Sequence, residues 1–199
     1  MRVIIKKIER VLDDYFKVDK ATLQYELFNG EMSEELIRLN FIRGHSVALL
    51  LYNMDTNSVI LTQQFRYPVY AIDAKKAWLW EIIAGSIDYG ETGIQTLQRE
   101  TFEEAGFRIR NPEFVNEFFV SPGGTSEKIS LYYAEVTNHD RIGPGGGVTS
   151  EGENLKIEEI PLERAFRMVD TGEICDAKSI IALLWLKNRL REIRTDQVK

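Results

Sequence analysis

Hydrophobic positions are densest in the middle of the chain, where they form short runs of strand length. The continuous apolar run from Val47 to Tyr52 is typical of a strand buried on both faces. Further runs predict five more strands, at 59–65, 78–83, 114–120, 129–136 and 155–160. Two strands are also expected at 21–28 and 36–42, on either side of an Asn-Gly turn at 29–30.

Apolar or small residues recur at helical spacing in three segments. The first, 92–105, is followed by Gly106, which is a typical helix stop. The second, 162–169, follows Pro161, a residue that suits the first position of a helix. The third, 177–193, is long and strongly apolar. Strands that precede and separate helices predict a mixed fold of the α/β or α+β class.

The change of pattern near residue 44 predicts two parts, an N-terminal β subdomain at 1–43 and a main domain at 44–199. A piece of about forty residues buries too little surface to be stable by itself. We therefore expect the subdomain to pack on the main domain, on a second copy of the chain, or on both.

Composition narrows the class of protein. Of the 199 residues, 44% are apolar and 28% are charged, which argues against disorder throughout the chain. The net charge of −6 argues against nucleic acid as a partner, and an anionic substrate would need a local positive site or a bound cation. The single cysteine excludes an intrachain disulfide. Because no run has the length of a membrane span and the N-terminus does not resemble a signal peptide, we expect a cytoplasmic protein without membrane contact.

Three carboxylates gather on one face of the first predicted helix. Glu100, Glu103 and Glu104 stand at positions i, i+3 and i+4, where like charges repel one another. They also lie in the last turn, where the helix dipole disfavours anions. A divalent cation that prefers oxygen ligands, Mg²⁺ or Mn²⁺, would compensate this repulsion. From these three residues alone, a solvated glutamate-rich surface remains the alternative.

The segment from Gly85 to Phe107 resembles the Nudix signature, G-x5-E-x7-R-E-U-x-E-E-x-G-U, where U is a bulky apolar residue. All the fixed letters are present, as Gly85, Glu91, Arg99, Glu100, Glu103, Glu104 and Gly106. Thr101 in one U place is a departure from the pattern. Resemblance to the ADP-ribose pyrophosphatase branch continues at 64–66 (QFR), 121–127 (SPGGTSE), 145–148 (GGGV) and 176–179 (DAKS). GDP-mannose hydrolases of the same branch share much of it.

The resemblance implies an α/β/α sandwich with a mixed sheet, and Mg²⁺ or Mn²⁺ as the cofactor. Glu100 and Glu104 match the principal metal-binding carboxylates of the family, and Glu103 matches an additional ligand. The backbone carbonyl of Ala84 matches a further ligand in the ADP-ribose-cleaving branch. A metal-dependent attack of water on a diphosphate needs no covalent nucleophile.

The same resemblance assigns roles to residues around these ligands. Gly85 permits a tight turn and is expected at the substrate site. Arg99, expected among the catalytic residues, orients the carboxylates rather than reacting. Glu151 and Glu153 match the two glutamates of the family's catalytic loop, one of which is the general base. We favour Glu151, and a merely solvated acidic loop is the alternative.

Residues that bind the substrate are expected at four further positions. Arg66 matches a phosphate or ribose contact, although a surface salt bridge would explain it as well. Glu81 and Glu127 resemble binding-site acids, and Pro122 matches the proline that marks ADP-ribose cleavage in the family. These residues predict hydrolysis of a nucleoside-diphosphate sugar, with ADP-ribose first and GDP-mannose or a UDP-sugar as alternatives.

Two further points concern the oligomeric state of the protein and a rival function. Related enzymes are dimers that exchange their N-terminal region, so we expect a homodimer. A nucleotide-sugar-sensing Nudix module without catalysis is the rival of another class. Such modules usually lose signature carboxylates, whereas here the set is intact.

Overall fold

The computed structural model describes residues 1–196, which form two compact units. The N-terminal unit contains Met1–His45 together with Phe118–Lys128. The larger unit contains Ser46–Glu117 and the chain from Ile129 onwards. The segment 118–128 is therefore part of the same unit as residues 1–45, although more than seventy residues separate the two in the sequence.

The N-terminal unit is an antiparallel three-stranded sheet of order β1-β2-β3, formed by Val3–Asp13, Lys17–Tyr25 and Leu36–Ile42. Strand β3 lies where the pattern predicts it, and β2 starts four residues earlier than expected. The pattern does not predict β1. Its register with β2 shifts at two places, between Ile5 and Lys7 and between Arg10 and Leu12. Each bulge reverses the alternation of inward and outward side chains, so no period of two persists along the strand.

The segment 118–128 is fixed to this sheet by β3. The Phe41 N–H donates to the Gly124 carbonyl at 2.9 Å, and the Thr125 hydroxyl donates to the Phe41 carbonyl at 2.7 Å. These two bonds occupy backbone groups of Phe41 near the end of β3. They give a physical reason why the segment belongs to the N-terminal unit.

The larger unit contains a mixed sheet of seven strands in the order β10-β5-β4-β9-β8, with β6 paired to β5 and β7 paired to β4. The strands are β4 (His45–Asn53), β5 (Ser58–Phe65), β6 (Trp78–Glu81), β7 (Ile83–Ser86), β8 (Glu113–Phe119), β9 (Lys128–Val136) and β10 (Lys156–Pro161). Val47 to Leu51 of β4 are completely buried, as expected from their apolar run. The mixed α+β class is therefore confirmed.

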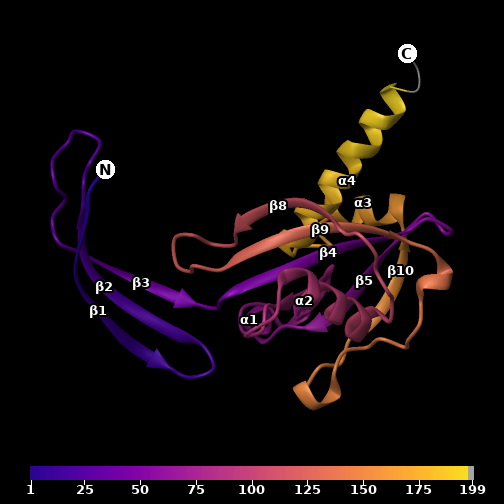
Figure 1. The fold of residues 1–199 in the computed structure, drawn as a ribbon, viewed down its shortest axis with the longest axis horizontal. Helices are drawn as coiled ribbons and strands as arrows, with labels where there is room; N and C mark the ends of the chain where they lie inside the picture. Colours follow the sequence, from indigo (N-terminus) through magenta and orange to yellow (C-terminus); the bar gives the residue numbers. More distant parts are fainter. Residues whose placement is uncertain (197–199) are drawn as a thin grey trace. The chain divides into compact units, whose positions relative to one another are not determined.

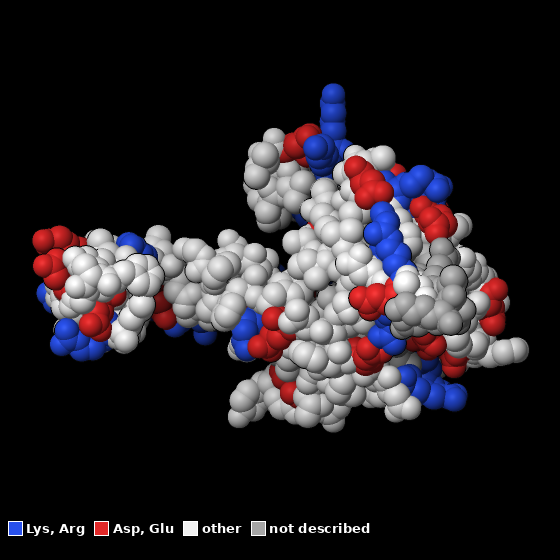
Figure 2. Space-filling view, turned by 90° about the horizontal axis from the view of Figure 1, so that it is seen from above, with Lys and Arg blue, Asp and Glu red and all other residues white. Residues whose placement is uncertain are grey.

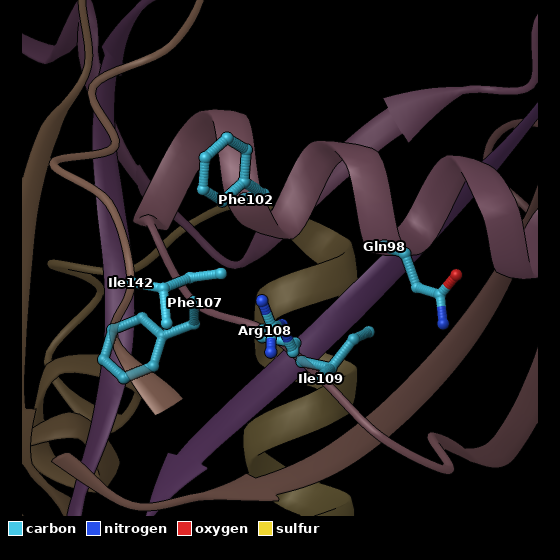
Figure 3. A pocket seen from close by; sticks show the side chains of 6 residues that line it. All are labelled: Gln98, Phe102, Phe107, Arg108, Ile109 and Ile142. Carbon is cyan, nitrogen blue, oxygen red and sulfur yellow. The ribbon is translucent and has the colours of Figure 1, made fainter. Parts of the chain in front are cut away.

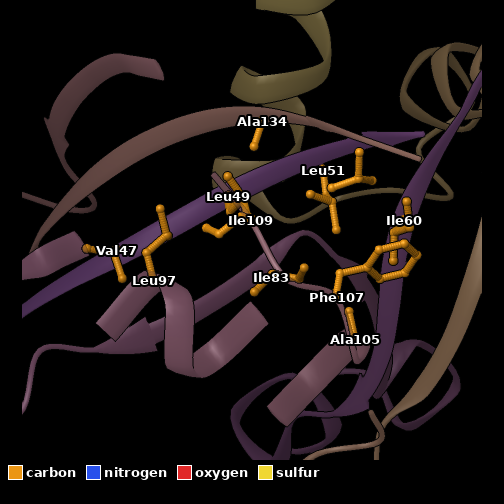
Figure 4. Close-up of a cluster of buried hydrophobic side chains, with 11 residues drawn as sticks. Val47, Leu49, Leu51, Ile60, Ile83, Leu97, Ala105, Phe107, Ile109 and Ala134 are labelled. Atoms are coloured by element: carbon orange, nitrogen blue, oxygen red, sulfur yellow. The ribbon is translucent and has the colours of Figure 1, made fainter. Parts of the chain in front are cut away.

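Helices cover both faces of this sheet. Helix α2 (Gly93–Glu100) lies on one face, and α3 (Leu162–Asp170) and α4 (Ala177–Asp196) lie on the other (Figure 1). Short helical turns connect the strands: α1 (Tyr67–Tyr70), η1 (Ala74–Lys76), η3 (Asn138–Asp140) and η4 (Thr149–Glu151). Under α2, a buried apolar cluster joins Leu97 and Phe107 to β4 residues such as Leu49 and Leu51 (Figure 4). This packing fixes the helix of the signature segment, residues 93–105, against the sheet, and we call it the signature helix.

In the larger unit, two elements differ in kind from the sequence-based expectation. The predicted strand 78–83 is divided at Ile82, where the chain leaves β5 as β6 and joins β4 as β7. The predicted helix 92–105 is α-helical only to Glu100, and Thr101–Ala105 (η2) forms a π-helical turn. Such turns are frequent at functional sites.

Among residues 1–196, no helix combines the length and the apolarity needed to cross a membrane. On the face drawn in Figure 2, acidic and basic side chains are interspersed.

Candidate active site

The signature helix has well-defined ends. At its start, the Thr92 hydroxyl accepts the Gln95 N–H at 3.3 Å, and the Gln95 side chain accepts the Thr92 N–H at 2.8 Å, which forms a capping box. At its end, Gly106 adopts a φ of 76°, in the left-handed region that favours glycine. A Cβ on Gly106 would also lie 2.2 Å from the Gly143 carbonyl oxygen. Both reasons explain a glycine at this position of the signature.

Glu100 is buried against the backbone of the β7 strand. Its side chain lies so close to Gly85 that a Cβ there would be 2.0 Å from Glu100 Oε1. Burial raises the pKa of the Glu100 carboxyl, the Arg99 charge opposes this, and repulsion from Glu103 and Glu153 adds to it, which leaves the pKa at about 7. Gly85 is therefore needed because any side chain would displace the Glu100 carboxylate.

Glu104 lies beside Glu100 and is buried more completely, with 5% of its surface exposed. Its Oε2 accepts the Ala84 N–H at 3.4 Å. Burial, together with repulsion from Glu100 and Glu153, raises the pKa of the Glu104 carboxyl well above its ordinary value. Glu100 and Glu104, which we call the carboxylate pair, are thus not part of a solvated surface. The backbone at 84–85 lies against both.

Arg99 contacts the acidic residues around the pair. Its Nη1 lies 2.9 Å from Glu103 Oε2 and 3.0 Å from Glu100 Oε1. Its Nε and Nη2 each lie 3.2 Å from a Glu91 oxygen. The hydrogen bond to Glu91 is the main cause that raises the pKa of Arg99. Arg99 therefore forms ion pairs with Glu103 and Glu100, and the orienting role that the resemblance implies stays a prediction.

The glycine-rich loop, residues 143–154, is anchored to the C-terminal end of the signature helix. The Gly146 N–H donates to the Glu104 carbonyl at 2.8 Å, and the Gly147 N–H donates to the Glu103 carbonyl at 2.9 Å. The last carbonyls of a helix have no partner within it, and the loop supplies these donors. Gly145 has a φ of 66°, and a Cβ on it would lie 2.6 Å from the Glu104 carbonyl oxygen. The glycines thus let the loop backbone approach the helix end.

The two glutamates of this loop, Glu151 and Glu153, differ in burial and in their distance from the carboxylate pair. Glu153 is half-buried, accepts the Val148 N–H at 2.9 Å, and acts electrostatically on both members of the carboxylate pair. Glu151 ends the short turn η4 and is exposed. The structure therefore brings Glu153 toward the pair, while Glu151 stands on the outer part of the loop.

Arg66 forms an ion pair with the buried Glu81, and Lys178 extends it. Arg66 donates to both Glu81 oxygens, at 2.7 and 2.8 Å, and Lys178 Nζ lies 2.5 Å from Glu81 Oε2. Burial raises the pKa of the Glu81 carboxyl, but the two cations outweigh it and lower the pKa to about 2. Sequence reasoning assigned no role to Lys178. A lysine at the start of a strongly apolar helix is the signal that could have indicated a buried ion pair.

Two of the expected substrate residues, Pro122 and Glu127, lie in the N-terminal unit. Glu127 is buried, and its Oε2 lies 3.6 Å from Arg43 Nη1. Pro122 is exposed. Their roles remain predictions. Of the expected site residues, the larger unit brings together Ala84, Gly85, Arg99, Glu100, Glu103, Glu104 and Glu153.

Whether the site can hold a divalent cation depends on the carboxylate pair, Glu100 and Glu104. Among the described residues, no group of three or more His, Cys, Asp or Glu side chains is arranged to hold a metal ion as the side chains stand. Glu103, the third expected ligand, is bound to Arg99. The pair itself fits a cation because two buried carboxylates repel each other, and the pKa of both stays raised even though Arg99 lies beside Glu100. Oxygen ligands of this kind suit Mg²⁺ or Mn²⁺.

A separate hollow of about 350 Å³ opens beside the signature helix (Figure 3). Gln98, Phe102, Phe107, Arg108, Ile109 and Ile142 line it. None of these is a carboxylate or another expected site residue. The hollow is therefore not the candidate active site.

Comparison with known proteins identifies the family of the chain. The Nudix domain family model matches residues 42–183. The chain is 36% identical over 179 residues to the ADP-ribose pyrophosphatase of Escherichia coli strain K12, which covers 90% of this chain and 85% of that protein. It is 34% identical over 187 residues to the GDP-mannose pyrophosphatase of Enterobacter sp. strain 638, with 94% and 96% covered.

A solved structure has the same fold as this chain. The crystal structure of an ADP compounds hydrolase superimposes with a TM-score of 0.73 over 96% of each chain, at 20% identity, which shows a common fold. The family model matches more than half of the chain, and the curated relatives cover nearly all of it. The chain therefore belongs to the Nudix family and is a hydrolase that acts on phosphorus-containing anhydrides.

Proposed function

We propose that the protein hydrolyses the pyrophosphate bond of a nucleoside-diphosphate sugar in a reaction that depends on Mg²⁺ or Mn²⁺. The observation that carries the proposal is the buried carboxylate pair lying against the 84–85 backbone within a complete signature. A pair of this kind is unfavourable in a mere scaffold, because Arg99 offsets the burial and repulsion of Glu100 only in part and the pKa of both carboxyls stays raised. It becomes favourable when a cation is bound.

The residues that would hold the cation are Glu100 and Glu104, with Glu103 and the Ala84 carbonyl as further ligands. When bound, the cation supplies positive charge to the diphosphate oxygens and acidifies water. Arg99 orients the ligands through its contacts with Glu100 and Glu103. Water adds to one phosphorus, the bridging P–O bond breaks, and the other phosphate leaves with the bridging oxygen.

We assign the general base to Glu151. A base must be free to approach the attacking water and to accept its proton. Glu153 is held by the Val148 N–H within the loop, whereas Glu151 is exposed and precedes Gly152, whose φ is 77°. A loop rich in glycine can close over a substrate and carry Glu151 with it. Glu153 would then fix the loop near the carboxylate pair.

Among nucleotide sugars, we place ADP-ribose first, with AMP and ribose 5-phosphate as the products. The relatives named ADP-ribose pyrophosphatase and the proline at position 122 support this ranking. Arg66, Glu81 and Glu127 offer groups that bind phosphate or ribose hydroxyls. In the structure, both Glu81 oxygens are occupied by cations, so Arg66 is the group of that pair that can reach outward, with its side chain 42% exposed.

GDP-mannose is the second candidate, with GMP and mannose 1-phosphate as the products. A GDP-mannose pyrophosphatase matches 94% of this chain. A UDP-sugar is the third candidate. A sensing module without catalysis is disfavoured because every signature carboxylate is present and the pair is buried where a cation would bind.

The test is a panel assay of purified protein with Mg²⁺ and ADP-ribose, GDP-mannose, a UDP-sugar and a nucleoside triphosphate. We expect the highest kcat/KM for ADP-ribose, with AMP identified among the products. If the triphosphate is preferred by tenfold or more, about 1.4 kcal/mol of transition-state stabilisation, the proposed substrate class is wrong. No turnover of any compound, together with tight binding of one, would favour the sensing module.

We also propose a homodimer formed through the N-terminal unit. Its sheet exposes apolar side chains, including Ile4, Ile5, Ile8 and Leu39, each at least half exposed. A three-stranded sheet with such exposure is expected to bind another apolar surface. Light scattering at micromolar concentration tests this, and a fully active monomer would contradict it. A cytoplasmic location, a small-molecule substrate and the absence of a nucleic-acid partner complete the proposal.

A further inference from the structure

The strand that carries Ala84 and Gly85 changes its neighbour within the sheet at Ile82. Up to Glu81 the chain pairs with β5, where Thr62 faces Glu81. From Ile83 onwards it pairs with β4, where Leu49 faces Ile83. Ile82 itself is almost completely buried, so its N–H needs a partner that neither strand pairing provides.

Helix α4 supplies that partner. The Ile82 N–H donates to Ser179 Oγ at 2.8 Å, and Ser179 has no exposed surface. The Ser179 hydroxyl in turn donates to Asp176 Oδ2 at 2.5 Å, and Asp176 Oδ2 also accepts the Ser179 N–H at 3.1 Å. A carboxylate in this place caps the helix start and orients the hydroxyl so that its oxygen faces Ile82.

Lys178 connects the same helix start to Glu81. Its Nζ lies 2.5 Å from Glu81 Oε2 and 3.0 Å from Asp176 Oδ2, and its side chain is only 9% exposed. With Arg66, the group contains two cations and two anions, so it is neutral as a whole. A buried network of this kind is stable when every member is paired, and it then fixes geometry. Among the side chains that the structure describes, no buried N or O atom lacks a partner.

The position of this strand change decides which backbone groups reach the carboxylate pair. Two residues beyond Ile82, the Ala84 N–H contacts Glu104, and Gly85 then lies directly against Glu100. A shift of the strand at Ile82 would move both contacts. Because Ser179 lies 97 residues beyond Ile82 in the chain, the restraint is a tertiary one.

We infer that Asp176, Lys178 and Ser179, which we call the α4 clamp, are positioning residues for the active site. The clamp holds the strand change at Glu81–Ile82 and so fixes Ala84 and Gly85 against the carboxylate pair. The inference rests on the proposed function in one respect, namely that this backbone and the pair together form the cation site. Ser179 has no exposed surface, so its effect on the site is indirect and passes through Ile82 and through Asp176.

The decisive variant is Ser179→Ala, which removes the acceptor for the Ile82 N–H without adding volume. Ser58→Ala is the matched control. Ser58 is also buried and its hydroxyl donates to the Thr56 carbonyl, but it begins β5, at the end of that strand away from its pairing with β6. Hydrogen exchange of the 82–86 amides measures the positioning itself. Mn²⁺ binding without substrate, followed by electron paramagnetic resonance, measures its consequence for the cation site.

We expect Ser179→Ala to speed amide exchange at 82–86 and to weaken Mn²⁺ binding by about 10- to 100-fold, the range seen when groups behind metal ligands are removed. The kcat should fall by a similar factor and KM should change little. Ser58→Ala should match the wild type in all four measurements. If Ser179→Ala is too unstable to study, Asp176→Asn keeps the acceptor of the Ser179 hydroxyl but loses the charge toward Lys178, and the same directions are expected.

Unchanged exchange in the folded Ser179→Ala protein would overturn the inference, as would faster exchange with unchanged Mn²⁺ binding. A change in KM alone would also overturn it, because it would assign the clamp to substrate contact. If the wild type binds no Mn²⁺ and hydrolyses no nucleotide sugar, the proposed function fails. The exchange data then still decide whether the clamp holds the strand change.

Discussion

Replacement of Gly85 by alanine tests the geometry of the proposed cation site. The added Cβ would lie 2.0 Å from Glu100 Oε1, 2.1 Å from Cδ and 2.4 Å from Cγ. Because non-bonded carbon and oxygen atoms approach to roughly 3.5 Å, the carboxylate must move by about 1.5 Å. These atoms belong to the end of a flexible side chain, so the displacement falls on Glu100 rather than on the backbone. The fold should therefore persist.

The expected loss of activity follows from this displacement. A misplacement of about 1 Å in an active site can cost about 100-fold in rate, which corresponds to about 2.7 kcal/mol of transition-state stabilisation. We expect kcat for ADP-ribose to fall by about this factor, and Mn²⁺ binding to weaken with it. The melting temperature should change by only a few degrees, because Gly85 has no positive φ and Ala restricts the unfolded chain.

The matched control is Gly93→Ala in the same signature. Gly93 begins α2, and its added Cβ would lie 3.2 Å from Val47 Cγ1, which requires only a small adjustment. We expect nearly normal kcat for this variant. Steady-state kinetics and thermal unfolding of both proteins decide the matter. A Gly85→Ala enzyme whose kcat stays within threefold of the wild type would refute the reasoning that Glu100 needs its present position.

The remaining predictions concern the carboxylates. Glu104→Gln should lower kcat by at least 100-fold and abolish tight Mn²⁺ binding in a folded protein, since it removes charge where the cation binds; normal Mg²⁺-dependent turnover would contradict the metal site. Glu151→Gln should lower kcat strongly with little change in substrate binding, and Glu153→Gln should do less; the reverse order in steady-state kinetics would move the base to Glu153. Without metal, the raised pKa of Glu100, about 7, means that its carboxyl binds a proton more strongly in the folded state, so its contribution to the free energy of unfolding should fall by roughly 3 kcal/mol as pH rises from 4.5 to 7, and the raised pKa of Glu104 acts in the same direction. Glu81, with its pKa lowered to about 2, contributes stability that is present above pH 4.5 and is lost only as pH falls toward 2. Urea unfolding across this range with and without Mn²⁺ checks both signs, and Mn²⁺ should remove the fall above pH 4.5.

The sequence alone predicts the parts of this protein that depend on spacing along one element. The buried run of β4, the signature helix and its glycine stop all follow from residues close together in the chain. The glutamates at 100 and 104 share a helix face for the same local reason. The complete signature also predicts the family, which the comparisons confirm. The mixed α+β class follows from the order of strands and helices.

Only the tertiary structure decides which charges are paired and which are buried. The sequence cannot indicate that Arg99 binds Glu103, that Glu153 rather than Glu151 lies near the carboxylate pair, or that Lys178 reaches Glu81. Each depends on segments brought together by packing. The sequence pattern does not indicate strand β1, because its bulges break the period of two. The strand change at Ile82 was missed because a hydrogen bond to Ser179, 97 residues away, replaces a sheet bond there. Local periodicity contains no information on partners at such separation, since burial and hydrogen bonding across the fold determine them.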